Sequence, residues 1–292
     1  MNKFNVKRFL GYLLGVFLFY APFAYYQKTL AYWIGAPPAT NIHSFCLRIP
    51  LLNLLTGKGL AILSVAFISV LLLIGTAFFL GPFFCGRLCA SGALPEYLSK
   101  IVPDRFKINW QESVNPVPIR YGFLAGFLIT PLFGGSIACA LCNYSFMERL
   151  VVGSIQGNIG FLGSTAIITG FLWLGMFGVI AKGGRGFCSH LCPVGAIQSA
   201  VHSLGARFGF TYKLRYAREN CAGCGQCVKR CPMGAIEYAD GGLTYQIHNC
   251  ITCRQCAAGC KKKALSYGTG DPGWQNARSE SYGKDAAVEA IK

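Results

Sequence analysis

Eight cysteines in the C-terminal third of the chain fall into two runs with the same spacing. The run "CAGCGQCVKRC" begins at Cys221, and the run "CITCRQCAAGC" begins at Cys250. Both follow the order Cys-x2-Cys-x2-Cys-x3-Cys. Grouped cysteines at such short spacings favour ligation of a metal or cluster over a disulfide framework, and they hold the backbone in tight loops. Residues 221–260 are therefore the most constrained part of the chain.

This spacing is typical of bacterial ferredoxins, where closely spaced thiolates bind one [4Fe–4S] cluster and the fourth cysteine reaches the other cluster. Structural zinc also binds paired cysteines, but the duplicated order favours iron and sulfide. We therefore predict an α+β ferredoxin domain with two [4Fe–4S] clusters over residues 201–267. The ligands would be Cys221, Cys224, Cys227 and Cys260 for the first cluster, and Cys250, Cys253, Cys256 and Cys231 for the second.

The remainder of the chain is unusually apolar. Of 292 residues, 53% are hydrophobic and only 13% are charged, which favours a membrane protein. Four apolar runs, near residues 9–26, 60–84, 119–141 and 159–181, are each long enough to span a bilayer, which needs about 20 residues. We expect a membrane all-α domain of four transmembrane helices over residues 1–200, in contact with lipid, and a tail over residues 268–292.

The formal net charge of +16 has a pattern of its own. Basic residues flank the apolar runs rather than forming a nucleic-acid-binding surface, so we expect no nucleic acid partner. Lys3, Lys7 and Arg8 precede the first run, and more follow the second and fourth runs. The positive-inside rule then predicts a multi-pass protein of the cytoplasmic (inner) membrane, with both termini and the ferredoxin domain in the cytoplasm.

Two of the apolar runs end in the same motif. "FCGRLCASGA" holds Cys85 and Cys89, and "FCSHLCPVGA" holds Cys188 and Cys192, which indicates an internal repeat. The predicted topology brings both pairs to one face. Three interpretations stay open: a further iron–sulfur or metal centre, a redox-active or partner-docking thiol site, and structural cysteines at helix ends.

A second group of potential ligands is expected on the opposite face. It consists of His43, Cys46, Cys139 and Cys142, whose spacing suits a four-ligand metal or cluster site. In an oxidising compartment, a disulfide or unliganded thiols are the plainer outcome. For a quinol site, which requires a polar proton acceptor, His43 is our candidate, with Tyr25, Tyr26 and Glu148 as further possibilities. The sequence indicates no certain catalytic residue.

Taken together, these features resemble the NapH-type membrane polyferredoxins, whose relatives include NosR, MauN and CcoG. The resemblance covers about residues 5–267. "FCSHLCPVGAI" fits the family's Cys-x3-Cys-Pro motif, whereas Ala90 replaces the proline in the first copy.

The resemblance implies a quinol-dehydrogenase-like subunit for electron transport. Such a subunit exchanges electrons between the quinone pool and redox partner proteins of ferredoxin, cytochrome or flavoprotein type. The alternative is a CcoG-like assembly factor that reduces copper or thiols, which the outer-face cysteines keep open.

Overall fold

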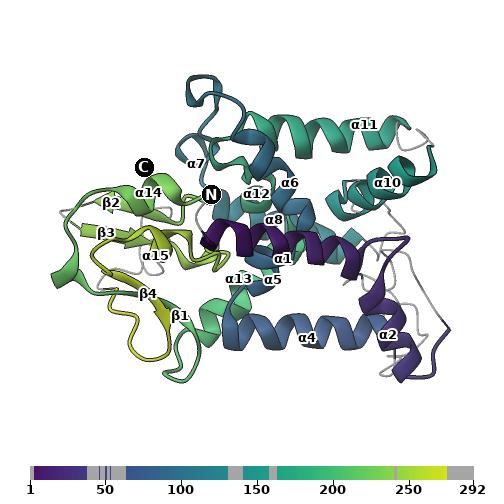
Figure 1. Ribbon diagram of the computed structural model, residues 1–292, viewed down its shortest axis with the longest axis horizontal. Coiled ribbons are helices and arrows are strands. Elements are labelled where there is room, and N and C mark those ends of the chain that lie inside the picture. Colours follow the sequence, from purple (N-terminus) through teal and green to yellow (C-terminus); the bar gives the residue numbers. More distant parts are fainter. Residues whose placement is uncertain are drawn as a thin grey trace, which may run out of the picture.

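The structure is a computed structural model that describes residues 3–37, 46, 50, 53, 64–130, 141–157, 163–239 and 242–274. Figure 1 shows helices over most of the molecule and short strands gathered at one end. The N-terminal helix crosses the middle and begins beside the strands. The cysteine-rich loops therefore lie at the strand end, against the beginning of the chain.

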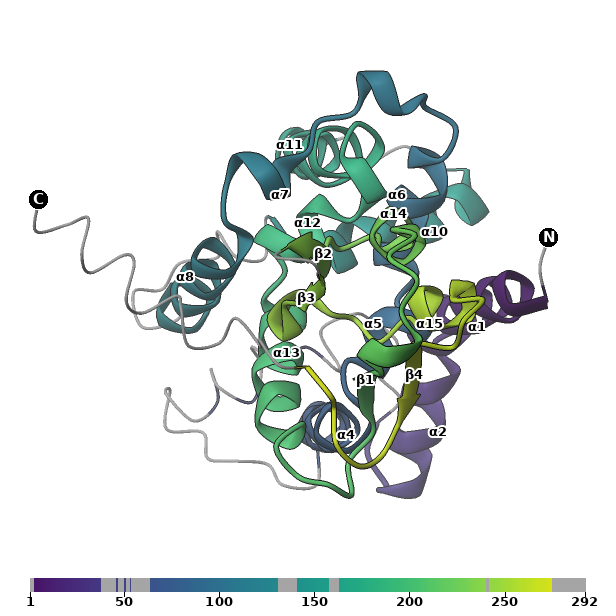
Figure 2. The same cartoon turned by 90° about the vertical axis from the view of Figure 1, so that its left-hand side faces the viewer.

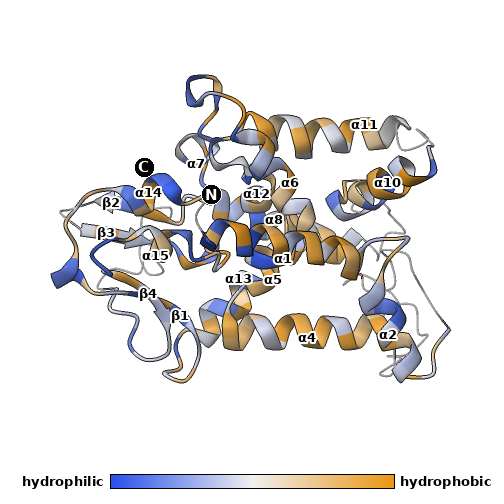
Figure 3. Ribbon diagram, viewed as in Figure 1, coloured by the Kyte–Doolittle hydropathy of each residue, from blue (hydrophilic) through white to orange (hydrophobic). Residues whose placement is uncertain are grey.

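Helices form most of the described part of residues 3–205. They are α1 (Lys3–Phe19), α2 (Tyr25–Trp33), α4 (Val65–Leu80), α5 (Phe83–Arg87), α6 (Ala90–Ser99), η2 (Asp104–Phe106), α7 (Trp110–Ser113), α8 (Pro116–Ile129), α10 (Asn143–Gln156), α11 (Ser164–Gly170), η5 (Phe171–Val179), η6 (Lys182–Gly184), α12 (Gly186–His190) and α13 (Pro193–Gly205). Of these, η5 is a π-helix. Figure 3 shows that α1, α4 and α11 are largely apolar.

The predicted four-span membrane fold is wrong, and with it the predicted multi-pass membrane location. Among the described residues, no helix is both long and apolar enough to cross a membrane. Local breaks shorten the apolar runs. The first run is divided between α1, with 17 residues, and α2, on either side of Pro22. The second yields a helix of 16 residues that ends where Gly81, at φ 66°, and Pro82 follow.

The basic residues also have another explanation than membrane topology. Arg8, Arg120 and Arg185 are each only 1% exposed, so their charges face internal partners rather than one side of a bilayer. These three arginines therefore give no support to the membrane orientation that we predicted from the positive-inside rule. Counting lysines and arginines cannot separate the two roles, because the sequence does not show which side chains become buried.

The two cysteine motifs lie in corresponding positions of a repeated helical unit. In the first copy, α4 leads to the short α5 and then to α6; in the second, η5 leads to the short α12 and then to α13. The copies pack reciprocally, because α13 lies against α4 and α6 lies against η5. Ala90 and Pro193 each occupy the first position of the helix after the motif. Proline is favoured there and alanine is tolerated, so the departure at Ala90 leaves the helix start intact.

Two small antiparallel sheets form the strand end. Strand β1 (Lys213–Tyr216) pairs with β4 (Leu265–Gly268), and β2 (Ile236–Ala239) pairs with β3 (Gly242–Tyr245). The short helices α14 (Gln226–Arg230) and α15 (Gln255–Gly259) pack against each other and against these strands. Their shared core consists of Leu214, Tyr216, Ala235, Ile236, Leu243, Tyr245, Cys256, Ala264 and Leu265.

The strand end is joined closely to the helical part. Figure 2 shows β1 and β4 beside α4. There the Tyr212 N–H donates to the Phe79 carbonyl at 2.8 Å, and the Tyr267 hydroxyl donates to the Leu80 carbonyl. A second contact is at Gly86 in α5, where an added Cβ would collide with the Ile251 carbonyl. The loop containing Ile251 therefore rests directly on the first cysteine motif.

Candidate iron–sulfur sites

The first cavity at the strand end is lined by four cysteines. Cys221, Cys224 and Cys227 come from the first run, and Cys260 closes the cavity from the second, around a space of about 420 Å³. Gly223 and Gly225 adopt left-handed φ values of 63° and 66° between these cysteines. Glycine takes this conformation without steric cost, which lets the loop curl around the cavity. Cys224 is exposed, so this cavity reaches the surface.

The second cavity has the complementary set. Cys250, Cys253 and Cys256 come from the second run, and Cys231 comes from the first. Thr252 and Arg254 stand where the first run has glycines, yet they keep left-handed φ values of 46° and 62°. Such a conformation is unfavourable for residues with a Cβ, so the surroundings must impose it. One result is that the Thr252 N–H donates to Cys250 Sγ at 3.3 Å.

The donor sets in both cavities suit iron–sulfur clusters. Each cavity combines three cysteines of one run with the last cysteine of the other, which is the crossed order that the spacing predicts. Burial raises the pKa of Cys231 to about 12 and that of Cys250 to about 11, so both thiols are protonated near neutral pH and must lose the proton when they bind iron. The individual ligand roles stay predictions.

Within the described residues, no three His, Cys, Asp or Glu side chains are gathered closely enough to hold a single metal ion. A structural zinc site has four ligands about 2.3 Å from one point. In a [4Fe–4S] cluster each cysteine binds a different iron atom, so the ligands stand further apart.

The four cysteines of the helical repeats form another group. All four are buried. Cys85 in the first copy corresponds to Cys188 in the second, and Cys89 corresponds to Cys192. Cys89 caps the N-terminus of α6 and accepts a hydrogen bond from Gly92 N at 3.3 Å; Cys192 caps α13 and accepts one from Gly195 N at 3.5 Å. At Cys192 the hydrogen bond from Gly195 N lowers the pKa of the thiol, but burial outweighs this effect. The two pairs lie near each other, because Gly92 donates to Cys89 Sγ and a Cβ added at Gly92 would lie 3.3 Å from Cys188 Sγ. We had expected both pairs on one face from the four-span topology, which is wrong, so the helical packing is the reason for their proximity.

Further polar groups point at these sulfur atoms. The Tyr144 hydroxyl donates to Cys89 Sγ at 3.0 Å, and the Gln198 amide donates to Cys85 Sγ at 3.2 Å. Burial raises the pKa of Cys188 to about 11, an effect that the positive charge of Arg185 opposes. Burial likewise raises the pKa of Cys192 to about 12. Sequence reasoning missed Tyr144 and Gln198, since neither belongs to a recognisable motif.

A buried ion pair network lies beside this group and was also missed. The Glu96 carboxylate accepts from Nη1 and Nη2 of Arg8, at 2.6 and 2.7 Å, and from Arg185 Nε at 2.6 Å. The Gln255 amide of α15 donates to the same carboxylate at 3.1 Å. Arg185 also donates to the Cys85 carbonyl at 3.0 Å. The network therefore ties α1, both repeats and the second ferredoxin loop together.

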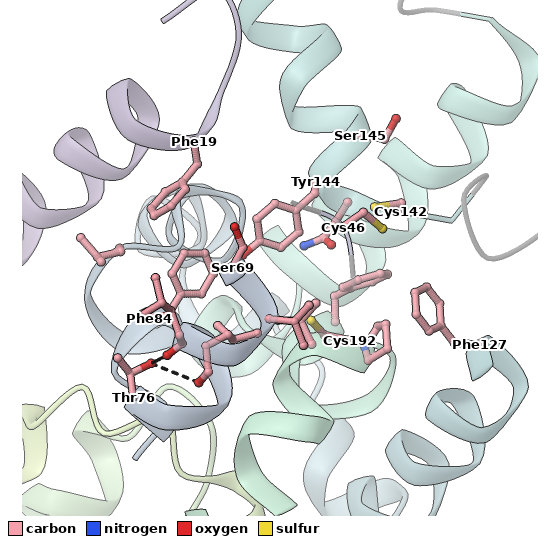
Figure 4. Close-up of a pocket in the computed structure, with 18 of the residues that line it drawn as sticks. Phe19, Cys46, Ser69, Thr76, Phe84, Phe127, Cys142, Tyr144, Ser145 and Cys192 are labelled. Carbon is pink, nitrogen blue, oxygen red and sulfur yellow. Dashed lines mark hydrogen bonds between the residues drawn. The ribbon is translucent and has the colours of Figure 1, made fainter. Parts of the chain in front are cut away.

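An apolar pocket of about 300 Å³ opens on the other side of the repeat cysteines. Figure 4 shows Cys192, Cys46, Cys142 and Tyr144 around it, with Phe127 at one end. Its few polar groups include Tyr26, whose hydroxyl is 3.0 Å from the Ser69 hydroxyl.

The residues that we predicted for the outer face are placed only in part. Cys46 and Cys142 both line the apolar pocket, but His43 and Cys139 lie outside the described residues. The four-ligand site on that face therefore stays a prediction, as does a role for His43 with quinol. Of the other quinol candidates, Tyr25 is exposed and Glu148 lies on α10, and neither lines the pocket.

Comparison with protein families finds two kinds of match. Residues 220–265 match a 4Fe-4S dicluster domain. A 4Fe-4S binding domain matches twice, over residues 63–109 and 165–211. The double match covers both cysteine motifs and confirms the internal repeat. The cofactor class predicted from the sequence is thereby supported at the level of 4Fe-4S binding domains.

Comparison with individual proteins finds relatives that are also named ferredoxin-type proteins. The methylamine utilization ferredoxin-type protein MauN of Methylobacillus flagellatus is 28% identical over 68% of the chain and 63% of its own length. MauN of Methylorubrum extorquens is 30% identical over 63% of the chain and 58% of its own length. The ferredoxin-type protein NapH of Escherichia coli is 29% identical over 51% of the chain and 47% of its own length. The chain thus spans about half to three fifths of these relatives. No solved structure matches it.

Proposed function

We propose that this chain, which belongs to the NapH- and MauN-type family of 4Fe-4S ferredoxin proteins, is an iron–sulfur electron-transfer protein that exchanges electrons between a quinone and redox partner proteins. The observation that carries the proposal is the pair of crossed four-cysteine cavities at the strand end. When bound, a [4Fe–4S] cluster takes up and releases one electron at a time.

The two cavities differ in their exposure to solvent. The second cavity is enclosed by apolar side chains such as Met233 and Ile236, which are fully buried and exclude water. The first cavity has the exposed Cys224 at its edge. Because an exchange of electrons between proteins requires close approach, the first cavity is the entry or exit side for a partner.

A basic rim surrounds that side. Arg230, Lys261 and Lys262 line the first cavity, and both lysines are exposed. Positive charge around a redox centre attracts an acidic partner and speeds its association at low salt. We therefore assign the rim to an acidic ferredoxin or flavodoxin-type protein.

The apolar pocket suits the quinone arm of the proposal. Its volume lies at the lower end of the range for small-molecule sites. Phe84 and Phe127 offer aromatic surface to a flat ring, while Tyr26 and Ser69 offer hydroxyl groups to a quinone oxygen. The pocket is also next to Cys192 and Tyr144, which belong to the repeat-cysteine group.

Anaerobic stopped-flow measurement tests both arms. Reduction by an acidic ferredoxin should bleach the visible absorbance, and a Lys261→Glu, Lys262→Glu variant should be reduced at least about tenfold more slowly at low salt. A Lys28→Glu control, on α2 at the far end of the molecule, should match the wild type. If the charge reversal has no effect at low salt, the assignment of the rim is wrong.

For the quinone arm, a short-chain quinone should reoxidise the reduced protein. Leu73→Trp would fill the pocket and should raise the quinone concentration at half-maximal rate by about tenfold. Leu71→Trp is a matched control, because Leu71 is on the same helix, is 53% exposed and does not line the pocket. Equal behaviour of the two variants would contradict quinone binding here, without affecting the ferredoxin arm.

A further inference from the structure

The ferredoxin cavities and the apolar pocket are separated by the four repeat cysteines. Cys85 and Cys188 pack in one buried group with Cys253 and with Cys231, which line the second ferredoxin cavity. On the opposite side, Cys192 lines the apolar pocket. The repeat cysteines are therefore in contact with both sites that the proposed function uses.

We propose that Cys85, Cys89, Cys188 and Cys192, two from each repeat, together hold a third iron–sulfur cluster. Four cysteine thiolates are the usual ligand set of both two-iron and four-iron clusters. The pseudo-symmetric packing of the copies explains why each motif carries only two cysteines. A single copy would supply half of the site.

The hydrogen bonds around the sulfur atoms favour ligation over a purely structural role. Gly92 N, Gly195 N, the Tyr144 hydroxyl and the Gln198 amide donate to three of the four sulfur atoms. Hydrogen bonds of this kind stabilise thiolates and tune the potential of a cluster. Thiols that only filled space among apolar side chains would gain little from so many donors.

Charge gives an independent argument. Arg8, Arg120 and Arg185 are almost completely buried near the site, whereas Glu96 is the buried carboxylate among them. Positive charge thus exceeds negative charge in a region shielded from water, which is costly without a further anion. The Arg120 Nε–H donor is buried and has no hydrogen-bond partner. An anionic cluster with four thiolates would compensate the excess charge.

This inference rests on the proposed function and is tested separately by counting iron. Anaerobically prepared wild-type protein should contain about twelve irons per chain with a four-iron third cluster, or about ten with a two-iron cluster. A Cys85→Ser, Cys188→Ser variant should lose only the excess, and its two ferredoxin signals in electron paramagnetic resonance should persist. Persistence of these signals also shows that the variant is folded.

Two further readouts separate the third cluster from the ferredoxin domain. The double variant should still be reduced by ferredoxin but should lose electron exchange with quinone by at least about 100-fold. A Ser203→Ala control, which lines neither ferredoxin cavity nor the apolar pocket, should keep the wild-type iron content. A wild-type content of about eight irons, with both ferredoxin clusters intact, would overturn the third cluster and leave the proposed function standing. A content well below eight would contradict the proposed function itself.

Discussion

Glu96 and Arg185 form a buried ion pair in which Arg185 Nε donates to Glu96 Oε2 at 2.6 Å. The two side chains are 2% and 0% exposed. Burial by itself would raise the pKa of Glu96, but the positive charges of Arg185 and Arg8 outweigh this effect and hold the pKa below its ordinary value. The carboxylate is therefore charged in the folded protein and balances part of the buried guanidinium charge.

Replacing this carboxylate should destabilise the whole molecule. Glu96→Gln leaves two buried guanidinium groups without their anion, and the loss should be about 3 kcal/mol in the free energy of unfolding. Asp104→Asn is a matched control, because Asp104 pairs with Lys107 at 2.7 Å but is 86% exposed. Thermal unfolding should show a marked loss for the first variant and no measurable change for the second. Equal losses would show that the buried network is not specially important.

The repeats and the ferredoxin domain can pack closely at Gly86 because this residue has no side chain. A Cβ at this position would meet the Ile251 carbonyl and would lie 3.0 Å from Cys253 N. Gly86→Ala should therefore displace the second ferredoxin loop and change its paramagnetic signal. Gly75→Ala, also helical but with nothing within 4 Å of the added methyl, should leave the signal unchanged and be neutral or slightly stabilising. An unaltered signal in Gly86→Ala would show that the contact at Gly86 does not position the second ferredoxin loop.

His202 should make stability sensitive to mild acid. Burial, and then the charges of Lys213 and His248, lower its pKa to about 4, and neither ring nitrogen has a hydrogen-bond partner. Between pH 6.5 and about 4 the unfolded chain binds a proton that the folded protein resists, so stability is lost as pH falls through this range.

The matched variant isolates this contribution. From pH 7 to pH 5, wild-type protein should lose about 2 kcal/mol more stability than His202→Gln, as measured from unfolding at each pH. The comparison between variants removes the acid sensitivity of the clusters, which both proteins share. Parallel pH dependence of the two proteins would mean that folding does not lower the pKa of His202.

Sequence and structure agree best where the information is local. The cysteine spacing in residues 221–260 predicted which sulfur atoms share a cavity, because this spacing is typical of ferredoxins in which the fourth cysteine of each run reaches the other cluster. The same holds for the repeat, since Cys85 and Cys188 occupy corresponding short helices. In both cases a short motif was enough for the prediction, because its spacing either matches a known ligand pattern or recurs elsewhere in the chain.

Predictions that depend on contacts between residues far apart in the chain were wrong or could not be made. Apolar runs were taken as continuous spans, but the helices end at breaks such as Gly81 and Pro82. Arg8 was counted among the basic residues that set membrane orientation, although it pairs with Glu96, which is 88 residues away in the chain. Hydropathy and composition contain no information about such pairings, and only the packed structure reveals them.

The crossed arrangement of the ferredoxin cysteines is the central claim, and redox-titrated electron paramagnetic resonance of two single variants tests it most directly. Cys231 belongs to the first run but lines the second cavity, and Cys260 belongs to the second run but lines the first. We predict two [4Fe–4S] signals in wild-type protein, with Cys231→Ser changing the second cluster and Cys260→Ser changing the first. Each variant altering the cluster of its own run, or the absence of iron–sulfur signals, would contradict the account.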